Sequence, residues 1–410
     1  MTPYSTAFEH RPDATGASDA AGAPVARACL SRRSLLALSG AALLGLGLAG
    51  CSAAPSDGGA DAGEGAAAGA DDPAGAGDAS GAEGTSGHAD SAEAAGAAEE
   101  PASGTTFAFN TLVSIQAYGV DQDVVTECMR ECARYDGLFS ARTEGSDIYR
   151  INEAHGEPVE VDPDTADLLA QSLEYCALSD GTFDITIGAV SLLWDFSEGV
   201  KPADDAIVDA VRHVDYTCVQ VDGTTVTLSD PDAKIDLGGI AKGWIADRLC
   251  DRLVEAGATA ALISLGTSST YALGHKPDGT PWRIGMRDPM GESAASISAV
   301  VELADVALTS SGLYDQQFEL DGTTYWHILD PATGYPAQTD MLGVAVVTPT
   351  AVQGDAFSTM LFIKGIEEGS AWLAENYPDV AARFIGEDDG AVLLNGFEGY
   401  GYEEVEPSDG

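Results

Sequence analysis

The chain has 410 residues and a formal net charge of −47, with 66 acidic side chains against 19 lysines and arginines. Nucleic-acid binding requires a basic surface, so this composition argues against nucleic acid as a partner. The length fits one large domain or two ordinary ones.

The N-terminal segment 1–51 has the pattern of an export signal. Two arginines, Arg32 and Arg33, precede an apolar run over Leu35–Ala49, and Cys51 follows in the sequence LAGC. The run is shorter than the ~20 apolar residues of a membrane span, and twin arginines are typical of the route that exports folded proteins. LAGC resembles a bacterial lipobox, so we expect Cys51 to be lipidated and to hold the protein on the extracytoplasmic face of the cell membrane. An ordinary cleaved signal with an incidental cysteine is the alternative.

The segment 52–104 has the composition of a tether. It consists almost entirely of alanine, glycine, aspartate, glutamate and serine, and no lysine or arginine occurs between Arg33 and Arg130. Such a segment cannot bury enough apolar surface to offset the entropy lost on ordering. Repulsion between like charges should extend it. We therefore expect a disordered acidic linker between the membrane and the folded part.

A globular composition begins near residue 105 and continues to 404, followed by a short tail, 405–410. Apolar residues at helical spacing predict helices, and β-branched and aromatic runs predict strands. Few long βα units alternate, so we predict a single α+β (mixed α/β) domain with mixed sheets flanked by helices. In chain order we expect strands within 105–119, helices over 123–140 and 165–181, strands over 258–266, 271–274, 282–289, 296–312 and 343–350, and helices over 350–365 and 367–377.

Five cysteines fall in the predicted domain, and none forms a CxxC pair or a Cys/His metal-ligand spacing. We expect them to be buried thiols, and a disulfide outside the cell stays the alternative. They are Cys128, Cys132, Cys176, Cys218 and Cys250.

The stretch from Ala233 to Leu253 predicts a strand, a glycine-rich turn and a helix. The strand is AKIDL, the turn is GGIAKG, and the helix carries Ile245 and Leu249 on the face of Leu253. Glycines let a backbone approach an anion closely, a helix N-terminus offers unpaired N–H groups, and Lys242 adds a full positive charge. The pattern is neither of the common nucleotide-binding glycine motifs, so a plain tight turn is an equally open interpretation.

Asp355 and Thr359 are four residues apart in a predicted helix, so their side chains share one face. A carboxylate and a hydroxyl suit a hard cation such as Mg2+, which prefers oxygen ligands and leaves positions for phosphates. Ser358 could join through water. The alternative is that Asp355, near the start of the helix, serves as a cap or as a partner of the helix dipole.

In the sequence YWHILDPATGYPA, His327 lies three residues before Asp330. A histidine so close to an aspartate could be a base with the group that orients it. The alternative is the end of a strand followed by a turn that Asp-Pro initiates.

These motifs, together with GTFDIT, WRIGMRDP and LTSSG in this order, resemble the FAD:protein FMN transferase (ApbE) family. The resemblance extends from Phe107 to about residue 400. It implies an enzyme that binds FAD with Mg2+, transfers FMN onto a threonine or serine hydroxyl of an acceptor protein as a phosphoester, and releases AMP. Several members are exported lipoproteins, in agreement with the lipobox.

The resemblance also implies roles for individual residues. It places the metal ion on the backbone carbonyl of Gly239 and the side chains of Asp355 and Thr359. It makes His327 the first candidate for proton transfer, with Asp330 as a second catalytic candidate. It assigns contacts with FAD to Asp236, Lys242, Thr182, Phe183, Asp184 and Leu329.

Five positions depart from the family pattern. Phe109 stands where the family has a flavin-contacting methionine, and an aromatic ring there could still pack on the flavin. Arg142 replaces a tyrosine and could stack on the ring system or pair with a phosphate. Thr267 and Ser268 replace glycine and asparagine, and Ala332 replaces the arginine of DPRTG.

The sequence thus predicts an extracytoplasmic, lipid-anchored flavin transferase. The expected partners are FAD and acceptor flavoproteins, such as membrane electron-transport subunits or exported FMN-binding proteins. Two alternatives stay open. One is a Mg2+-dependent FAD pyrophosphatase, in which water replaces the acceptor hydroxyl to give FMN and AMP. The other is a non-catalytic lipoprotein that stores or delivers FAD.

Overall fold

A computed structural model describes residues 100–291, 296–313, 316–386 and 390–405. The predicted export signal, its Cys51 and nearly all of the predicted tether lie outside these ranges, so they stay predictions. Among the residues that the structure describes, no helix is both long and apolar enough to cross a membrane.

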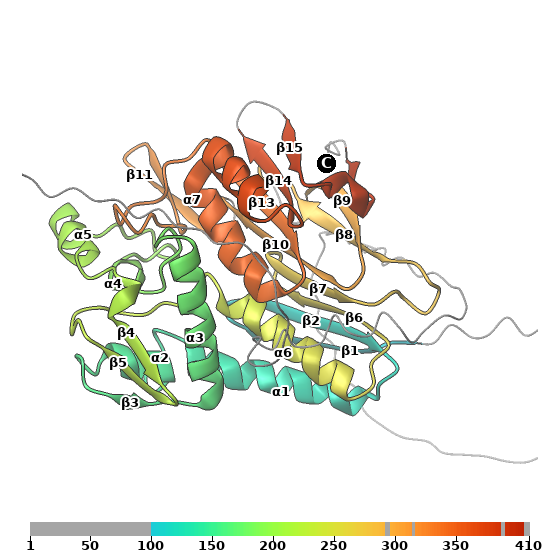
Figure 1. Ribbon diagram of the computed structural model, residues 1–410, viewed down its shortest axis with the longest axis horizontal. Helices are drawn as coiled ribbons and strands as arrows, with labels where there is room; N and C mark the ends of the chain where they lie inside the picture. The colour runs from blue at the N-terminus through green and yellow to red at the C-terminus, as the bar shows by residue number, and fades with distance from the viewer. Residues whose placement is uncertain (1–99, 292–295, 314–315, 387–389, 406–410) are drawn as a thin grey trace, which may run out of the picture. The chain divides into compact units, whose positions relative to one another are not determined.

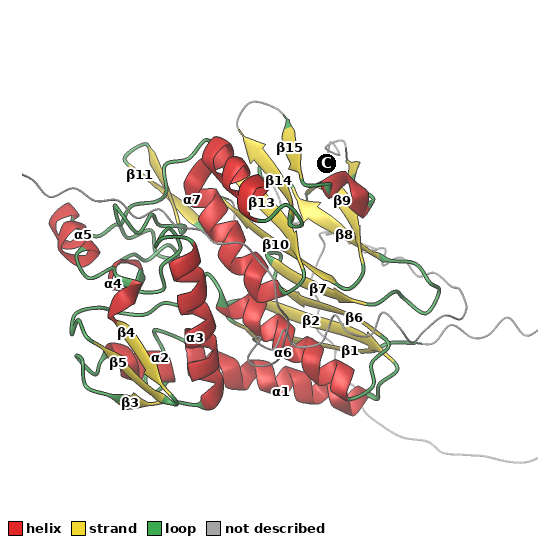
Figure 2. Ribbon diagram, in the orientation of Figure 1, coloured by secondary structure: helices red, strands yellow, loops and turns green. Residues whose placement is uncertain are grey.

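The largest element is an eight-stranded sheet (Figures 1 and 2) with the strand order β1-β2-β6-β7-β10-β13-β14-β15. All neighbouring strands pair antiparallel. The inner strand β13, of sequence MLGVAVVT, is almost continuously apolar because both of its faces are covered. The bounds are β1 Ala102–Ala108, β2 Thr111–Tyr118, β6 Ala260–Leu265, β7 Ser269–Leu273, β10 Val306–Gly312, β13 Met341–Thr348, β14 Ala381–Gly386 and β15 Ala391–Leu394.

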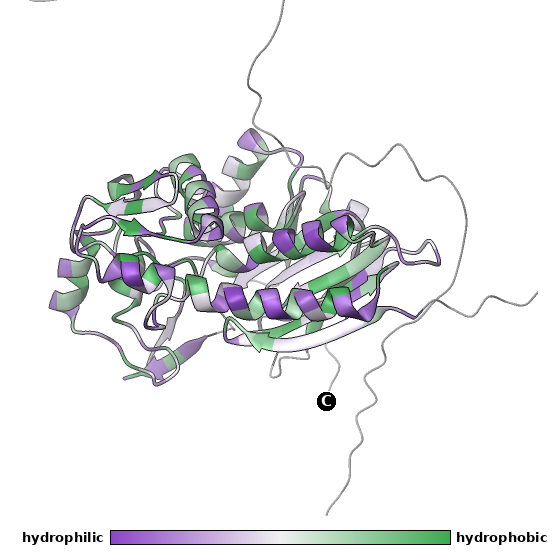
Figure 3. Cartoon of the chain, turned by 90° about the horizontal axis from the view of Figure 1, so that it is seen from below, coloured by the Kyte–Doolittle hydropathy of each residue, from purple (hydrophilic) through white to green (hydrophobic). Residues whose placement is uncertain are grey.

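Three helices cover one face of this sheet: α1 (Gln122–Phe139) contacts β1 and β2, α6 (Ala241–Glu255) contacts β6 and β7, and α7 (Ala351–Asn376) contacts β10 and β13. Each helix is held there by an apolar face. In Figure 3, hydrophobic and hydrophilic segments alternate along the helices that lie over the sheet. On α1 the buried side chains recur every three or four residues, at Val125, Cys128, Cys132, Tyr135 and Phe139.

A second apolar core fills the opposite face of the large sheet. Gly104, Ile115 and Ile263 are paired across β1, β2 and β6, and Gly104 faces α1. Successive side chains of a strand point to opposite faces, so Leu262, next to Ile263, points away from α1. There Leu262 packs into a core shared with Trp282 and other residues of a smaller sheet. That sheet has the order β16-β9-β8, with bounds β8 Trp282–Arg287, β9 Ile297–Leu303 and β16 Glu403–Glu404.

The chain between α1 and α6 forms a group of helices and short strands, drawn on the left side of Figure 1. It contains the three-stranded sheet β3-β5-β4, and a hairpin of β11 and β12 comes later in the chain. The remaining bounds are β3 Val159–Glu160, β4 Val219–Asp222, β5 Thr225–Leu228, β11 Gln317–Leu320, β12 Thr323–Trp326, α2 Asp147–Asn152, α3 Pro163–Leu178, α4 Gly188–Ser191, α5 Asp204–Val211, and the 3-10 helices η1 Tyr216–Cys218 and η2 Phe397–Tyr400.

Helices α6 and α7 are locked together by reciprocal side-chain caps. Asp355 of α7 accepts a hydrogen bond from the Gly243 N–H in the first turn of α6, at 2.6 Å. Asp247 of α6 accepts the first N–H groups of α7, from Ala351 at 2.8 Å and Val352 at 2.9 Å. Each carboxylate thus satisfies donors that a helix start leaves unpaired. Burial raises the pKa of Asp247 to about 7, although both backbone N–H groups favour its charged form.

The mixed fold confirms the predicted class, and most predicted elements are present. The predicted strand over 233–237 is wrong, because this segment makes only one isolated bridge, between Lys234 and Ile187. The two predicted late helices form one span, α7, but Gly365 inside it is non-helical at φ 78° and ψ 176°, so the chain does break there. All five cysteines of the described part are free and buried, which favours the thiol interpretation.

Candidate functional site

A cavity of about 530 Å3 lies where the chain segments singled out in the sequence meet. Its walls come from the β1–β2 turn, the loop after α3, the turn before α6, the segment after β12, and α7. Among the predicted site residues in the described part, all but Asp330 line it: Phe109, Arg142, Thr182, Phe183, Asp184, Asp236, Gly239, Lys242, His327, Leu329, Asp355 and Thr359.

The turn before α6 is held rigidly although no strand precedes it. The buried Asn152 side chain clamps the backbone of Ile235 by accepting its N–H at 2.7 Å and donating to its carbonyl at 2.9 Å. The carboxylate of Asp236 accepts from the Ser191 hydroxyl at 2.6 Å and from the Gly238 N–H at 2.9 Å. Asp236 therefore faces the cavity in a fixed position.

The residues predicted to bind the metal ion come together. A Cβ built on Gly239 would lie 3.6 Å from the Thr359 hydroxyl oxygen and 3.2 Å from the ring of Phe183. The side chain of Asp355 reaches the same cavity and is buried, with its second oxygen accepting from the Ser269 hydroxyl. Carbonyl, hydroxyl and carboxylate oxygens are the donors that Mg2+ prefers, so the residues present fit this ion.

Asp355 and Lys242 place opposite charges in the wall of the cavity. Burial raises the pKa of Asp355, while Lys242 opposes this rise. Lys242 itself donates to the Ser268 hydroxyl, at the position where the family pattern has asparagine. The cap interpretation of Asp355 is also correct in part, because its carboxylate caps α6 rather than its own helix.

The loop after α3 depends on Asp184 for its shape. One carboxylate oxygen of Asp184 accepts from the N–H and hydroxyl of Thr186, at 2.7 and 2.6 Å, and the other from the Tyr216 N–H at 2.9 Å. Burial raises the pKa of Asp184, and these hydrogen bonds oppose that rise. The carboxylate therefore positions the loop, while Thr182 and Phe183 present their side chains to the cavity.

The segment after β12 separates the two catalytic candidates. His327 lines the cavity. Its backbone N–H donates to the Gln316 carbonyl at 3.1 Å. Asp330 does not line the cavity, because its carboxylate accepts from the Ala332 N–H at 2.9 Å and from the Thr333 hydroxyl at 3.2 Å. This placement favours the turn interpretation of Asp330 and leaves His327 as the candidate for proton transfer.

Arg142 holds the end of α4 and the loop that follows it. Its guanidinium donates to the carbonyls of Ser191 at 3.2 Å and Trp194 at 3.1 Å. Since Ser191 also holds Asp236, Arg142 supports the same wall of the cavity that it lines.

Phe109 occupies a strained position at the tip of the β1–β2 hairpin. The two turn residues, Phe109 and Asn110, have φ of 54° and 57°, and the Phe109 N–H donates to Asp136 at 3.0 Å. A left-handed conformation costs roughly 1–2 kcal/mol for a residue other than glycine.

Phe109→Gly is therefore expected to relieve this strain, raising the free energy of unfolding by up to ~1 kcal/mol. Because it also removes a ring from the cavity wall, it should weaken FAD binding at the same time. Urea denaturation and quenching of FAD fluorescence measure the two effects. Asn110→Gly is the control, since it places glycine at the other left-handed position of the same turn and leaves the ring in place. Equal FAD affinity in both variants would show that the ring makes no contact.

Hydroxyl groups form one wall of the cavity, and Ser310 and Ser311 among them were not predicted from the sequence. Ser268, Ser310, Ser311 and Ser358 line the cavity, and the Ser311 hydroxyl donates to that of Ser358 at 2.9 Å. The signal was the sequence Thr-Ser-Ser, which occurs at 267–269 and again at 309–311. Adjacent antiparallel strands bring the two copies together, with Thr309 opposite Ser269.

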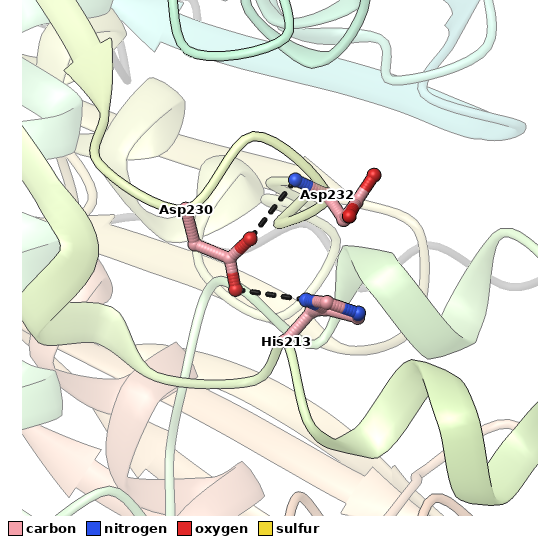
Figure 4. A group of neighbouring side chains, drawn as sticks. All are labelled: His213, Asp230 and Asp232. Atoms are coloured by element: carbon pink, nitrogen blue, oxygen red, sulfur yellow. Dashed lines mark hydrogen bonds and ion pairs between the residues drawn. The ribbon is translucent and has the colours of Figure 1, made fainter.

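Outside the cavity, His213, Asp230 and Asp232 form a group whose ligand atoms lie within 4.8 Å of one another (Figure 4). Asp230 accepts from the Asp232 N–H at 3.0 Å and is hydrogen-bonded to His213 at 2.8 Å. Burial raises the pKa of Asp230, but these bonds outweigh burial and hold it below the ordinary value. The group fixes the turn that leads into the segment of Asp236.

Comparison with known proteins gives one consistent result. The model of the ApbE family matches residues 109–384. This chain is similar to a FAD:protein FMN transferase of Treponema pallidum (strain Nichols), with 34% identity over 266 residues that cover 60% of this chain and 73% of the relative. It is similar to another of Klebsiella pneumoniae (strain 342), with 31% identity over 287 residues, 68% of this chain and 88% of the relative.

Solved structures agree. The crystal structure of the ApbE protein of Thermotoga maritima has a TM-score of 0.66 at 28% identity, covering 75% of this chain and 100% of that one. The Pseudomonas stutzeri flavinyl transferase ApbE has a TM-score of 0.64 at 26% identity, covering 74% and 97%.

Proposed function

The chain belongs to the ApbE family, and we propose on this premise that it transfers FMN from FAD to a threonine or serine hydroxyl of an acceptor protein and releases AMP. The curated relatives described above are FAD:protein FMN transferases, which makes this chain a flavin transferase. The observation that carries the proposal is the convergence of Gly239, His327, Asp355 and Thr359 on one cavity that also holds Lys242.

In the proposed reaction, the acceptor oxygen forms a bond to the FMN-side phosphorus of FAD, and the bond from that phosphorus to the AMP oxygen breaks. The hydroxyl proton passes to His327, which faces the cavity, and AMP leaves as an anion. Asp355, Thr359 and the carbonyl of Gly239 would hold Mg2+, which supplies neutralisation of the charge on the pyrophosphate oxygens.

Other residues of the chain position the substrate. Lys242 adds positive charge beside Asp355, and Asp236 presents a fixed carboxylate to the cavity. Phe183, against Gly239, offers an aromatic ring close to the proposed metal ligands. Catalysis of phosphoryl transfer rests mainly on such positioning and on charge neutralisation.

The proposed site of action is the extracytoplasmic face of the cell membrane, supported by the LAGC sequence at Cys51. Acceptors available there are membrane electron-transport subunits and exported FMN-binding proteins. The long acidic segment before the folded part would let the enzyme reach acceptors at some distance from its anchor.

The proposal is tested by incubating residues 100–410 with FAD and Mg2+, with and without a purified FMN-binding domain of an electron-transport subunit. The expected result is AMP release together with an increase in acceptor mass by one FMN, both abolished by a chelator. AMP release that is equal with and without acceptor, with no change in acceptor mass, would indicate the pyrophosphatase instead. Absence of AMP in both reactions would contradict every enzymatic assignment.

A further inference from the structure

Two adjacent serines at the turn between β6 and β7 contact the two charged side chains discussed above. The ammonium group of Lys242, on α6, donates to the hydroxyl of Ser268. The hydroxyl of Ser269 donates to one carboxylate oxygen of Asp355, on α7. Ser268 lines the cavity, whereas Ser269 is fully buried and does not line it. One short turn therefore contacts a positive charge from one helix and a negative charge from the next.

The backbone of this turn is held by the neighbouring strands. The Gly266 N–H donates to the Leu112 carbonyl of β2 at 2.9 Å. The Ser268 carbonyl accepts from the Ser310 N–H of β10 at 2.8 Å. Ser269 is the first residue of β7 and pairs with both β6 and β10. Both hydroxyl groups therefore extend from a fixed backbone, so they can hold the side chains that they contact in place.

The hydrogen bond from Ser269 orients the carboxylate of Asp355 and leaves it able to bind a cation. One carboxylate oxygen accepts from Ser269, and the other accepts from the Gly243 N–H at 2.6 Å. A carboxylate oxygen has two lone pairs, so each oxygen keeps one for a further partner. Hydrogen bonds of this kind set the orientation of side chains that bind metal ions. Ser269 is therefore placed to orient Asp355 toward the metal ion that we assign to it.

The hydrogen bond to Ser268 keeps Lys242 from pairing with Asp355. Lys242 precedes Gly243, whose N–H donates to Asp355, and the charge of Lys242 acts on that carboxylate. Within the part of the chain that the structure describes, Lys242 nevertheless forms no ion pair. An ion pair between the two would offset the negative charge that a metal ion needs. The Ser268 hydroxyl gives the ammonium group a neutral partner instead.

We propose that the two serines are positioning residues that keep Lys242 and Asp355 apart, so that the carboxylate binds the metal ion and the ammonium group serves an anionic group of the ligand. The inference rests on the metal site of the proposed function. Such a division suits a pyrophosphate, whose oxygens are stabilised by positive charge from more than one side. Ser268 acts through the lysine and Ser269 through the aspartate.

The test measures Mg2+ affinity by calorimetric titration of the full chain, so it needs neither acceptor nor turnover. Ser269→Ala should lower this affinity about tenfold or more, because the carboxylate loses the hydrogen bond that orients it. Ser268→Ala should lower it about threefold, because the released ammonium group pairs with Asp355 and competes with the ion. Ser268→Thr keeps a hydroxyl and should retain the wild-type affinity. Heat that remains in Asp355→Asn comes from other acidic groups and is subtracted.

Removal of the lysine separates the two roles. In a Lys242→Met background, Ser268→Ala should have no further effect on Mg2+ affinity, because no ammonium group is left to compete. Ser269→Ala should still lower the affinity about tenfold there. The matched control is Ser264→Ala on β6, since the Ser264 hydroxyl accepts from Thr270 at 3.5 Å and lies outside the cavity. This control should leave Mg2+ affinity unchanged.

A second measurement follows FAD affinity in the absence of Mg2+, by fluorescence quenching. Ser268→Ala should weaken FAD binding about threefold, because the ammonium group is then drawn to Asp355. Ser269→Ala should leave FAD binding unchanged. Equal effects of the two variants on FAD would contradict the separate roles.

The remaining outcomes also decide between the proposals. An unchanged Mg2+ affinity in Ser269→Ala, or a loss in Ser268→Ala that persists without Lys242, would overturn the positioning roles. An equal loss in Ser264→Ala would overturn them too, because the effect would then belong to the strands in general. A wild type that binds no Mg2+ would overturn them together with the metal assignment. The expected pattern of affinities without FMN transfer would support the positioning roles and refute the proposed transfer.

Discussion

Asp355→Asn is expected to lower FMN transfer by on the order of a thousandfold, the largest effect of any single substitution in the cavity. The change keeps the size of the side chain but removes the negative charge that a divalent cation needs. Asp355 is buried, so water cannot replace the lost charge at low cost. AMP release and acceptor mass measure the loss, and calorimetric titration with Mg2+ should show that binding of the ion has weakened.

The structure supplies a matched control in Asp247→Asn. Asp247, like Asp355, is a carboxylate that accepts backbone N–H groups between α6 and α7, but it does not line the cavity. Both variants should lose stability through weaker caps, by about 1 kcal/mol. Only Asp355→Asn should lose activity per folded molecule. Full activity with undiminished Mg2+ affinity in that variant would refute the metal assignment.

Gly243→Ala is expected to be the most destabilising single change in the helical layer. A Cβ at Gly243 would lie 2.2 Å from the carbonyl oxygen of Ala351 and 2.8 Å from the Cα of Val352. These are backbone atoms, so relief requires α6 and α7 to move apart. Overpacking of this kind costs about 3 kcal/mol or more, and here it would also separate Asp355 from the Gly243 N–H. Urea denaturation monitored by circular dichroism measures the loss.

Gly137→Ala is the control for Gly243→Ala, because it should raise stability where Gly243→Ala lowers it. Gly137 lies in α1, and a Cβ there would meet nothing within 4 Å. Alanine is the better helix former, so this variant should gain up to ~1 kcal/mol. Equal stability of the two variants would show that the close approach of α6 and α7 at Gly243 is not what constrains that position.

Local sequence patterns were sufficient for most elements and for much of the site. Apolar spacing predicts α1, and glycine at position 365 predicts the break inside α7. The turn after Asp236 and the four-residue spacing of Asp355 and Thr359 suggest an anion site and a cation site. That both belong to one cavity came from the family resemblance, because no pattern within one segment reports on another.

The wrong strand prediction has a physical cause. The segment 233–237 looks like a strand because its apolar residues are buried, but the side-chain amide of Asn152, and not a neighbouring strand, pairs with the backbone of Ile235 at its centre. The carboxylates of Asp184 and Asp330 accept hydrogen bonds within their own loops, and their roles in FAD contact and catalysis stay predictions. Whether a polar group faces a ligand or its own backbone depends on tertiary geometry, which a short motif does not contain.

The reciprocal caps between α6 and α7 have a consequence for the order of events during folding. The Gly243–Asp355 contact joins residues 112 positions apart, and the Asp247 contacts span 104 and 105 positions. Contacts of such long sequence separation form late, after the entropy of closing the intervening chain has been overcome. The proposed ligands Gly239, Asp355 and Thr359 are therefore apart in a nascent chain, so the proposed site for FAD and Mg2+ would assemble only when folding is nearly complete. The twin-arginine route that the sequence predicts carries folded proteins, so export by that route would allow the enzyme to be loaded beforehand.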